Sequence, residues 1–419
     1  MVTLCIAWGL LLYSCGKEEQ PEPQPEQQEE QQDPPEPVNP PEPPEPQQPE
    51  YPVPTLGTGL RSVYIDTPTG IYSKDIWVEG GTIQIVDDGG KLWFSDSLSI
   101  KGRGNSTWSY AKKPYTFKLS HKADLLGKGE SKRYVLLANW MDRTLLRNDV
   151  AFELARRTSI DWTPEGEFVE LYLNGVHKGN YWLGEQIKVE KTRIRADYLI
   201  ELDTYWDATW KFYSQYGYKP NTWNYGLPMN VKYPEDEDFS QEGLDRLQGM
   251  VWNLENTIYN GGDYSSMIDF DSFIDWYLVH ELTYNLEPNH PKSCYIHFRN
   301  GVLFAGPVWD FDWYTFQPNT SGWAIHNSIY FWELFKNAAF TARVKERWAE
   351  LKPLFEDVDN YIEQISERIS ASESINHQMW PCTSEVNRDQ NLTFSGAVNR
   401  LRKALSDRIA ELDRQVNKL

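Results

Sequence analysis

The chain has 419 residues, which is enough for one large domain or two domains of ordinary size. It carries 41 Lys and Arg against 61 Asp and Glu, and this net charge of −20 argues against nucleic acid as the main partner. Half of that charge lies in residues 17–54, where 14 of the 26 prolines occur with 11 acidic residues and one lysine. Such a composition cannot bury enough apolar area to offset its chain entropy, so we expect a disordered stalk over residues 15–54.

Residues 1–14 are largely apolar and lead directly to Cys15. This stretch is too short to cross a membrane and is typical of an export signal. A cysteine that follows a small residue here resembles a bacterial lipobox, which implies cleavage before Cys15 and lipidation of its thiol. The sequence therefore predicts a lipid-anchored protein of the bacterial cell envelope, outside the cytoplasm, at the outer membrane or the cell surface.

Two cysteines, Cys294 and Cys382, remain in the rest of the chain, because Cys5 is removed with the signal. An oxidising compartment permits a disulfide between them. Two buried free thiols fit the sequence equally well.

Residues 55–100 alternate apolar and polar side chains in short runs, which Gly80-Gly81 and residues 87–90 separate. This period of two predicts antiparallel strands. We interpret them as N-terminal strands that lead into the main domain, residues 101–419.

A basic, glycine-containing loop at residues 101–108 follows these strands, and a further strand follows at 112–119. Glycines let backbone N–H groups approach an anion, and Arg and Lys supply positive charge, so the pattern suits a phosphate cradle. A lone G-x-G is also found in plain hairpins, and the pattern alone does not separate the two interpretations.

The middle of the chain is predicted to alternate strands with one helix. We expect a buried strand at 134–139, then a helix that Asp142 or Thr144 caps, and a hairpin over 168–183. Residues 203–235 are rich in Trp, Tyr, Asn and Pro and are predicted to form a long irregular insertion. A loop of that length is usually functional or ordered by a partner.

Helical periodicity begins near Phe239 and dominates the rest of the chain. A helix over residues 271–284 ends at a loop, 285–291, whose conformations two prolines restrict. Asn300-Gly301 is a strong signal for a two-residue hairpin turn. Amphipathic helices are also predicted at 340–370 and 395–417.

Asp310 and Asp312 follow this hairpin and lie two residues apart. In an extended segment, this spacing places both carboxylates on one face, with Phe311 facing away. Two carboxylates in an aromatic, water-poor setting repel each other, and a hard cation such as Mg²⁺ relieves that repulsion. The competing interpretation is two aspartates at a solvated strand end.

Six stretches stand out in order along the chain: KGRGNSTW (101–108), KKPYTFKL (112–119), LLANWMDRTLLRND (136–149), ELYLNGVHKGNYWLGEQI (170–187), HELTYN (280–285) and GPVWDFDW (306–313). Together they resemble the CotH kinase family, atypical kinases named after a spore-coat protein. Protein kinases have the same order of parts along the chain: a glycine loop, then a polar loop, a hairpin and an Asp of the kind that binds metal. The common kinase signatures V-A-I-K and H-R-D are absent.

The resemblance implies an α+β, atypical protein-kinase-like, two-lobed fold with a β-rich N-terminal half and a helical C-terminal half. It implies transfer of the γ-phosphate of ATP, with Mg²⁺ or Mn²⁺, to Ser or Thr of a protein. By position, Asp310 looks like the metal-binding Asp of D-F-G, and Asp312 stands where a glycine is usual. Glu287 stands where the family commonly has the catalytic Asp, so its carboxylate can accept the hydroxyl proton with a reach about one methylene longer. Asn285 can orient Glu287 or bind a second metal.

The same resemblance implies a set of residues that bind the cofactor. These are Arg103, Asn105, Ser106, Lys113, Lys118 and Glu185. Within this set, the first three look like the phosphate-binding loop, and the sequence does not choose which of the two lysines binds phosphate. The glutamate stands at the family's hinge-side motif. Asp142 and Arg147 are expected to form a structural pair around a helix start.

Three interpretations of the function stay open from the sequence. The first is an exported, lipid-anchored kinase that acts on Ser or Thr of surface or envelope proteins. The second is a surface protein that binds or processes glycans, because 18 tryptophans and paired carboxylates suit sugar stacking and acid–base hydrolysis. The third is a catalytically inactive pseudokinase with a structural role, which agrees with Glu287 in place of Asp and with the scarcity of ATP outside the cytoplasm.

Overall fold

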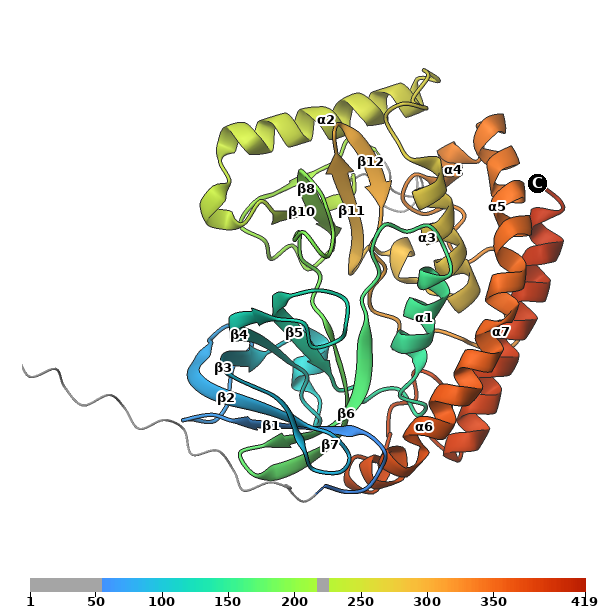
Figure 1. Ribbon diagram of the computed structural model, residues 1–419. Coiled ribbons are helices and arrows are strands. Elements are labelled where there is room, and N and C mark those ends of the chain that lie inside the picture. The colour runs from blue at the N-terminus through green and yellow to red at the C-terminus, as the bar shows by residue number, and fades with distance from the viewer. Residues whose placement is uncertain (1–54, 217–225) are drawn as a thin grey trace, which may run out of the picture. The chain divides into compact units, whose positions relative to one another are not determined.

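Figure 1 shows the fold, taken from a computed structural model that describes residues 55–216 and 226–419. These residues form a mixed α+β structure, with most strands in the N-terminal half and most helices in the C-terminal half, as the sequence predicts. The expected signal at 1–14 and the expected stalk at 15–54 lie outside the described residues.

Seven strands of the N-terminal half close into a barrel in the order β1-β2-β3-β4-β5-β7-β6. They are β1 (Arg61–Asp66), β2 (Val78–Val86), β3 (Leu92–Gly102), β4 (Tyr115–Ala123), β5 (Ser131–Leu137), β6 (Gly166–Leu173) and β7 (Val176–Glu185). Strands β1 and β6 pair in parallel, and the other neighbours are antiparallel. Strand β3 runs across residue 100, so the strands on both sides of that expected boundary belong to one barrel.

Alternating side chains fill the barrel and confirm the period of two predicted for residues 55–100. On β2, Ile83 and Ile85 are fully buried, whereas Gln84 between them is only partly buried. Burying side chains of this size contributes roughly 1.5–3 kcal/mol each. The barrel therefore has a hydrophobic core of its own, to which every strand contributes.

A second, five-stranded antiparallel sheet has the order β12-β11-β8-β10-β9. Its strands are β8 (Tyr198–Leu202), β9 (Lys211–Tyr213), β10 (Pro228–Tyr233), β11 (Cys294–Arg299) and β12 (Val302–Ala305). The prediction of an irregular insertion over residues 203–235 is wrong for β9 and β10. Phe212 of β9 pairs with Met229 of β10 and both are buried, a pairing across the chain that no local sequence period reveals. Residues 217–225 of this segment lie outside the described residues.

Seven α-helices are found in the described residues. They are α1 (Arg147–Arg156), α2 (Gln241–Tyr259), α3 (Phe270–Thr283), α4 (Phe331–Leu334), α5 (Ala338–Glu356), α6 (Val358–Met379) and α7 (Phe394–Val416). Helix α3 is buried on all sides and packs against α1, α5, α7 and β12, as expected for a central core helix. Helix α7 packs beside both α5 and α6, which follow each other along the chain; the three are drawn from orange to red in Figure 1.

Two Asn-Gly turns form the hairpins that the sequence predicts. Asn174 and Gly175 join β6 to β7 with φ angles of 51° and 73°, and Asn300 and Gly301 join β11 to β12 with φ angles of 52° and 80°. Two successive positive φ angles define the turn whose twist suits a two-residue hairpin. The second hairpin fixes where the chain enters the loop that carries Asp310.

The start of helix α1 is held by a buried ion-pair network. Asp142 accepts hydrogen bonds from the backbone N–H of Arg147 (2.8 Å) and of Thr144 (2.9 Å), although the residue at the helix cap itself is Leu146. The guanidinium of Arg147 pairs with Asp142 and also with Asp389 (2.6 Å), and all three side chains are buried. The predicted structural pair of Asp142 and Arg147 is confirmed. The prediction that Asp142 or Thr144 is the capping residue is wrong, because Leu146 occupies the cap position.

Cys294 and Cys382 are both buried free thiols, which decides between the two alternatives that the sequence leaves open. In the part of the chain that the structure describes, every helix is too short or too polar to cross a membrane.

We expect the Arg147 network to contribute strongly to folding stability. Asp389→Ala leaves part of a buried positive charge unpaired, and breaking a buried pair in this way costs about 3–5 kcal/mol. Guanidinium chloride unfolding measures the loss. The matched control is Asp407→Ala, which removes the exposed partner of Lys403 and is expected to change stability by less than about 0.5 kcal/mol. Equal losses in the two variants would contradict the assignment.

Candidate active site

Segments that lie far apart in the sequence meet at one cavity of about 1030 Å³. It is lined by the loop after β3, the ends of β5 and β8, the segment before β11 and the loop after β12. Such a volume accommodates a cofactor-sized ligand, because small-molecule pockets span roughly 300–1,000 Å³. Six residues predicted from the sequence line it: Arg103, Asn105, Ser106, Glu287, Asp310 and Asp312.

Three of the predicted cofactor-binding residues lie away from the cavity. The ammonium of Lys113 donates to the backbone oxygen of Trp108 (2.6 Å), and Lys118 is exposed on β4. Glu185 is buried at the end of β7 and accepts a hydrogen bond from Arg193 (3.2 Å). Their positions therefore support a structural role for Glu185 and no phosphate contact by either lysine.

Other lysines line the cavity in their place. Lys101 precedes the glycine loop, and its ammonium lies 5.0 Å from the centre of the Trp77 ring. Lys112 is buried and donates to the backbone oxygens of Ala138 (2.9 Å) and Asn180, and this burial lowers the pKa of Lys112 to about 7. Sequence reasoning missed both residues, although both stand in the stretches that carry the family resemblance.

The glycine loop brings its basic side chain to the cavity by a tight backbone path. Gly104 has a φ of 84°, and a Cβ there would lie 1.9 Å from the hydroxyl of Thr107, so only glycine fits. The guanidinium of Arg103 lies 5.0 Å from the centre of the Trp309 ring. Asn105 accepts a hydrogen bond from Lys74 (2.9 Å), which fixes the tip of the loop.

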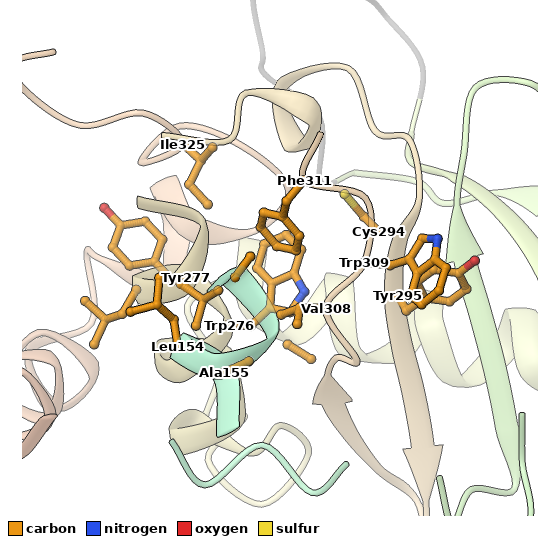
Figure 2. Close-up of a cluster of buried hydrophobic side chains, with 14 of the residues drawn as sticks. Leu154, Ala155, Trp276, Tyr277, Cys294, Tyr295, Val308, Trp309, Phe311 and Ile325 are labelled. Carbon is orange, nitrogen blue, oxygen red and sulfur yellow. The ribbon is translucent and has the colours of Figure 1, made fainter. Parts of the chain in front are cut away.

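The loop after β12 carries the carboxylates of Asp310 and Asp312, and its backbone is not the extended strand that the sequence predicts. Asp310 has a φ of 69°, in the left-handed region, so the prediction of an extended segment is wrong. Both aspartates nevertheless line the cavity, and Phe311 between them is fully buried. Figure 2 shows Phe311 pointing into the hydrophobic cluster that includes Trp276 and Val308.

Three side chains from separate elements hold this loop. Asn148 of α1 accepts the backbone N–H of Phe311 (2.7 Å), and Asn285 donates to the backbone oxygen of Asp310 (3.3 Å). The hydroxyl of Ser293 donates to the Asp310 carboxylate (3.2 Å). Asn148 and Ser293 were not predicted, and only their place beside conspicuous motifs could have drawn attention to them.

Burial sets the protonation of the aspartate pair. It raises the pKa of Asp310, which the nearby guanidinium of Arg103 opposes. It raises the pKa of Asp312 further, and the negative charge of Asp310 adds to the effect. Because both shifts favour the protonated form, the two buried carboxyl groups resist carrying two negative charges at once.

Glu287 faces the same cavity from a short 3-10 helix, η3 (Glu287–Asn289). Burial raises its pKa to about 7, with a further contribution from the charge of Asp310. Its backbone N–H donates to the side-chain oxygen of Asn285 (2.9 Å). Because the amide of Asn285 also bonds Asp310, it joins the Glu287 loop to the Asp310 loop; it does not line the cavity itself.

A further polar group at the end of β8 was missed by sequence reasoning. Glu201 accepts a hydrogen bond from the hydroxyl of Tyr295 (2.6 Å) and pairs with Lys232 (3.2 Å). Asp203 lines the cavity, and burial raises its pKa to about 6. Asp203 and Lys232 lie in the segment 203–235, which was interpreted as irregular, and Glu201 lies just before it; no motif marks these residues.

The residues present fit a divalent cation that binds together with a phosphate ligand. Among the described residues, no group of three or more His, Cys, Asp or Glu side chains is arranged to hold a metal ion. Asp310 and Asp312 offer two carboxylates, and Mg²⁺ commonly binds through one or two carboxylates together with substrate phosphates and water. The buried, mutually repelling pair gains most from such a cation.

The fold and the cavity together define a mixed α+β protein that combines a basic glycine loop, paired carboxylates and a third carboxylate with a raised pKa. Residues 100–412, most of the chain, match the CotH kinase protein family, so the chain belongs to this family. The match runs from the end of β3 to α7 and therefore includes all the residues that line the cavity except Lys74 and Asp75. No curated protein matches the chain.

The acidic cavity predicts how the stability of the metal-free protein depends on pH. The folded-state pKa values of Asp203, Glu287, Asp310 and Asp312 all lie above those of an unfolded chain, near 4. Their contribution to stability is therefore complete below about pH 4 and is lost as the pH rises through each folded-state pKa, about 6 for Asp203 and about 7 for Glu287. We expect the melting temperature to fall between pH 5 and pH 8 in the presence of a chelator.

The variant Asp312→Asn tests whether the aspartate pair causes this fall in melting temperature. Its amide offers Asp310 a hydrogen-bond donor without a bound proton, so the fall between pH 5 and pH 8 should be smaller and the variant should melt higher than wild type at pH 8. Differential scanning calorimetry at both pH values measures the difference. If the melting temperature falls equally in wild type and variant, the aspartate pair is not its cause.

Proposed function

We propose that this protein is an exported, lipid-anchored atypical protein kinase with a two-lobed, kinase-like fold. It transfers the γ-phosphate of ATP to Ser or Thr residues of surface or envelope proteins. The observation that carries this proposal is that the glycine loop, Glu287, Asp310 and Asp312 converge on one cavity from distant parts of the chain. Membership of the CotH kinase family supports it.

The glycine loop and the aspartate pair would bind the two charged parts of the nucleotide complex. The backbone N–H groups of the loop and the guanidinium of Arg103 would hold phosphate oxygens. Asp310 and Asp312 would hold Mg²⁺ or Mn²⁺. When bound, the cation neutralises negative charge on the phosphates, which is the main requirement of phosphoryl transfer.

Glu287 is the residue that would accept the proton of the acceptor hydroxyl. A pKa of about 7 suits a general base that works near neutral pH. Asn285 holds the backbone of Glu287 and the backbone of Asp310 at once, so it fixes the base relative to the metal-binding loop. This makes Asn285 a positioning residue.

One observation favours glycan binding as a second candidate function. Tyr205 and Trp313 both line the cavity, with exposed fractions of 48% and 44%. Exposed aromatic faces beside carboxylates are the arrangement in which sugar rings stack. A glycan that binds the wild-type protein without any nucleotide would support this candidate.

The first test of the kinase proposal separates nucleotide binding from transfer. The full chain is incubated with γ-labelled ATP, Mg²⁺ and membrane extract, and binding of ATP with Mg²⁺ is measured by calorimetry. We expect Glu287→Gln to keep nucleotide binding and to lower transfer by roughly a hundredfold or more, the scale of losing a general base. Asp310→Ala should lose metal-dependent nucleotide binding.

The control variant is Glu287→Asp, which restores the residue type that the resemblance implies and should retain part of the activity. Wild-type protein that binds ATP but transfers no label would support the inactive pseudokinase. Wild-type protein that binds no nucleotide would end the kinase proposal.

The proposed lipid anchor at Cys15 has its own test. It rests on the apolar residues 1–14 before the cysteine and on the acidic, proline-rich segment after it. We expect Cys15→Ala to move the protein from the membrane fraction to the soluble fraction after a high-salt wash, and Cys382→Ala to leave it in place. A Cys15→Ala variant that stays with the membrane would locate the anchor elsewhere.

A further inference from the structure

Most lysines that line the cavity are engaged by neighbouring groups. Lys188 pairs with Glu235, Lys232 pairs with Glu201 (3.2 Å), and Lys112 donates to backbone oxygens. Lys292 also lines the cavity, and its ammonium lies 5.1 Å from the centre of the Tyr205 ring. Within residues 55–216 and 226–419, Lys292 forms no ion pair with a carboxylate, so its charge is available to a ligand.

The backbone around Lys292 is fixed on both sides. The oxygen of Pro291 accepts the N–H of Thr204 (2.9 Å), and the N–H of Ser293 donates to Asp203 (3.3 Å). Asp203 also accepts the N–H of Tyr205 (2.7 Å), so one carboxylate positions both the lysine segment and the ring on which the lysine rests. A lysine on such a fixed segment can deliver its charge to a defined place.

Lys292 stands beside Asp310 and Glu287, the two groups proposed to take part in phosphoryl transfer. The hydroxyl of Ser293, the next residue, bonds the Asp310 carboxylate (3.2 Å). The positive charge of Lys292 acts directly on Glu287 and favours its ionised form. Two other cavity lysines without a carboxylate ion pair are directed elsewhere, because Lys101 lies over Trp77 and Lys74 donates to Asn105. Arg103 lies over Trp309, and its charge acts on Asp310.

We propose that Lys292 is a catalytic residue, whose ammonium contacts the phosphoryl group while it is transferred. This rests on the proposed function. A bond forms between the acceptor oxygen and the γ-phosphorus, the bond from that phosphorus to the bridging oxygen of ADP breaks, and the acceptor proton passes to Glu287. Lys292 leaves the Tyr205 ring to neutralise charge on the γ-phosphate oxygens, where preorganised cations accelerate transfer most.

The test compares binding with turnover in the full chain. Binding of ATP with Mg²⁺ is measured by calorimetry, and transfer of γ-label to casein, used as a hydroxyl-rich acceptor protein, gives kcat and KM. We expect Lys292→Met to change the Kd for ATP by less than about threefold and to lower kcat by about 10²–10³-fold, the scale of losing one group that stabilises the transition state. Lys292→Arg should recover part of kcat.

Lys336→Met is the matched control, because Lys336 likewise lies over an aromatic ring, that of Trp332 (3.8 Å), but outside the cavity. It should behave like wild type. An unchanged kcat in Lys292→Met overturns the inference, and so does a loss of ATP affinity with kcat unchanged. If wild type transfers no label to casein or to membrane extract, the proposed function fails and the inference with it. Transfer by wild type and Lys292→Met at equal rates overturns only the inference.

Discussion

The repulsion between Asp310 and Asp312 is the constraint on which the cavity depends. Two carboxyl groups buried side by side cannot both be ionised without a cation, and burial already raises the pKa of each. The protein supplies only partial compensation, through the hydroxyl of Ser293 and the guanidinium of Arg103. The two carboxylates therefore fit a divalent cation, which would supply positive charge beside them.

The position of this pair is set by helix packing more than by its own loop. Phe152 of α1 packs against both Trp309 and Phe311, with ring centres 5.6 Å and 6.4 Å apart, and His280 of α3 packs against Phe311 at 5.2 Å. Figure 2 shows Trp309 and Phe311 in the same cluster of buried hydrophobic side chains. The left-handed Asp310 costs roughly 1 kcal/mol or more, which these contacts offset. A shift of α1 would therefore move the carboxylates.

Features with a local cause could be predicted from the sequence, and features with a distant cause could not. The turn at Asn300-Gly301 follows from two residues that accept positive φ angles, and it forms as expected. The left-handed conformation of Asp310 depends on Asn148 and Asn285, which no spacing rule connects to it. The extended segment was inferred from local spacing alone, and this is why the prediction fails while the grouping of the two carboxylates in the cavity is confirmed.

A distant cause also explains why the sequence could not show which lysines line the cavity. In KKPYTFKL, neighbouring lysines look alike in sequence, yet Lys112 is buried and Lys118 is exposed on β4. Which lysine reaches the cavity depends on how the barrel closes, and closure is a property of all seven strands.

Glu287 has a longer side chain than the aspartate that the family resemblance implies at this position, and its surroundings determine its protonation. Its carboxylate is influenced by Asp310 and Asp203, which favour protonation, and by Lys292, which favours ionisation. Burial is the main cause that raises the pKa of Glu287 to about 7, and the neighbouring charges adjust it. The extra methylene changes the reach of the carboxylate, whereas burial and the neighbouring charges set its protonation. In the proposed kinase, a glutamate at this position would keep the pKa near neutrality that suits a general base, in spite of its longer side chain.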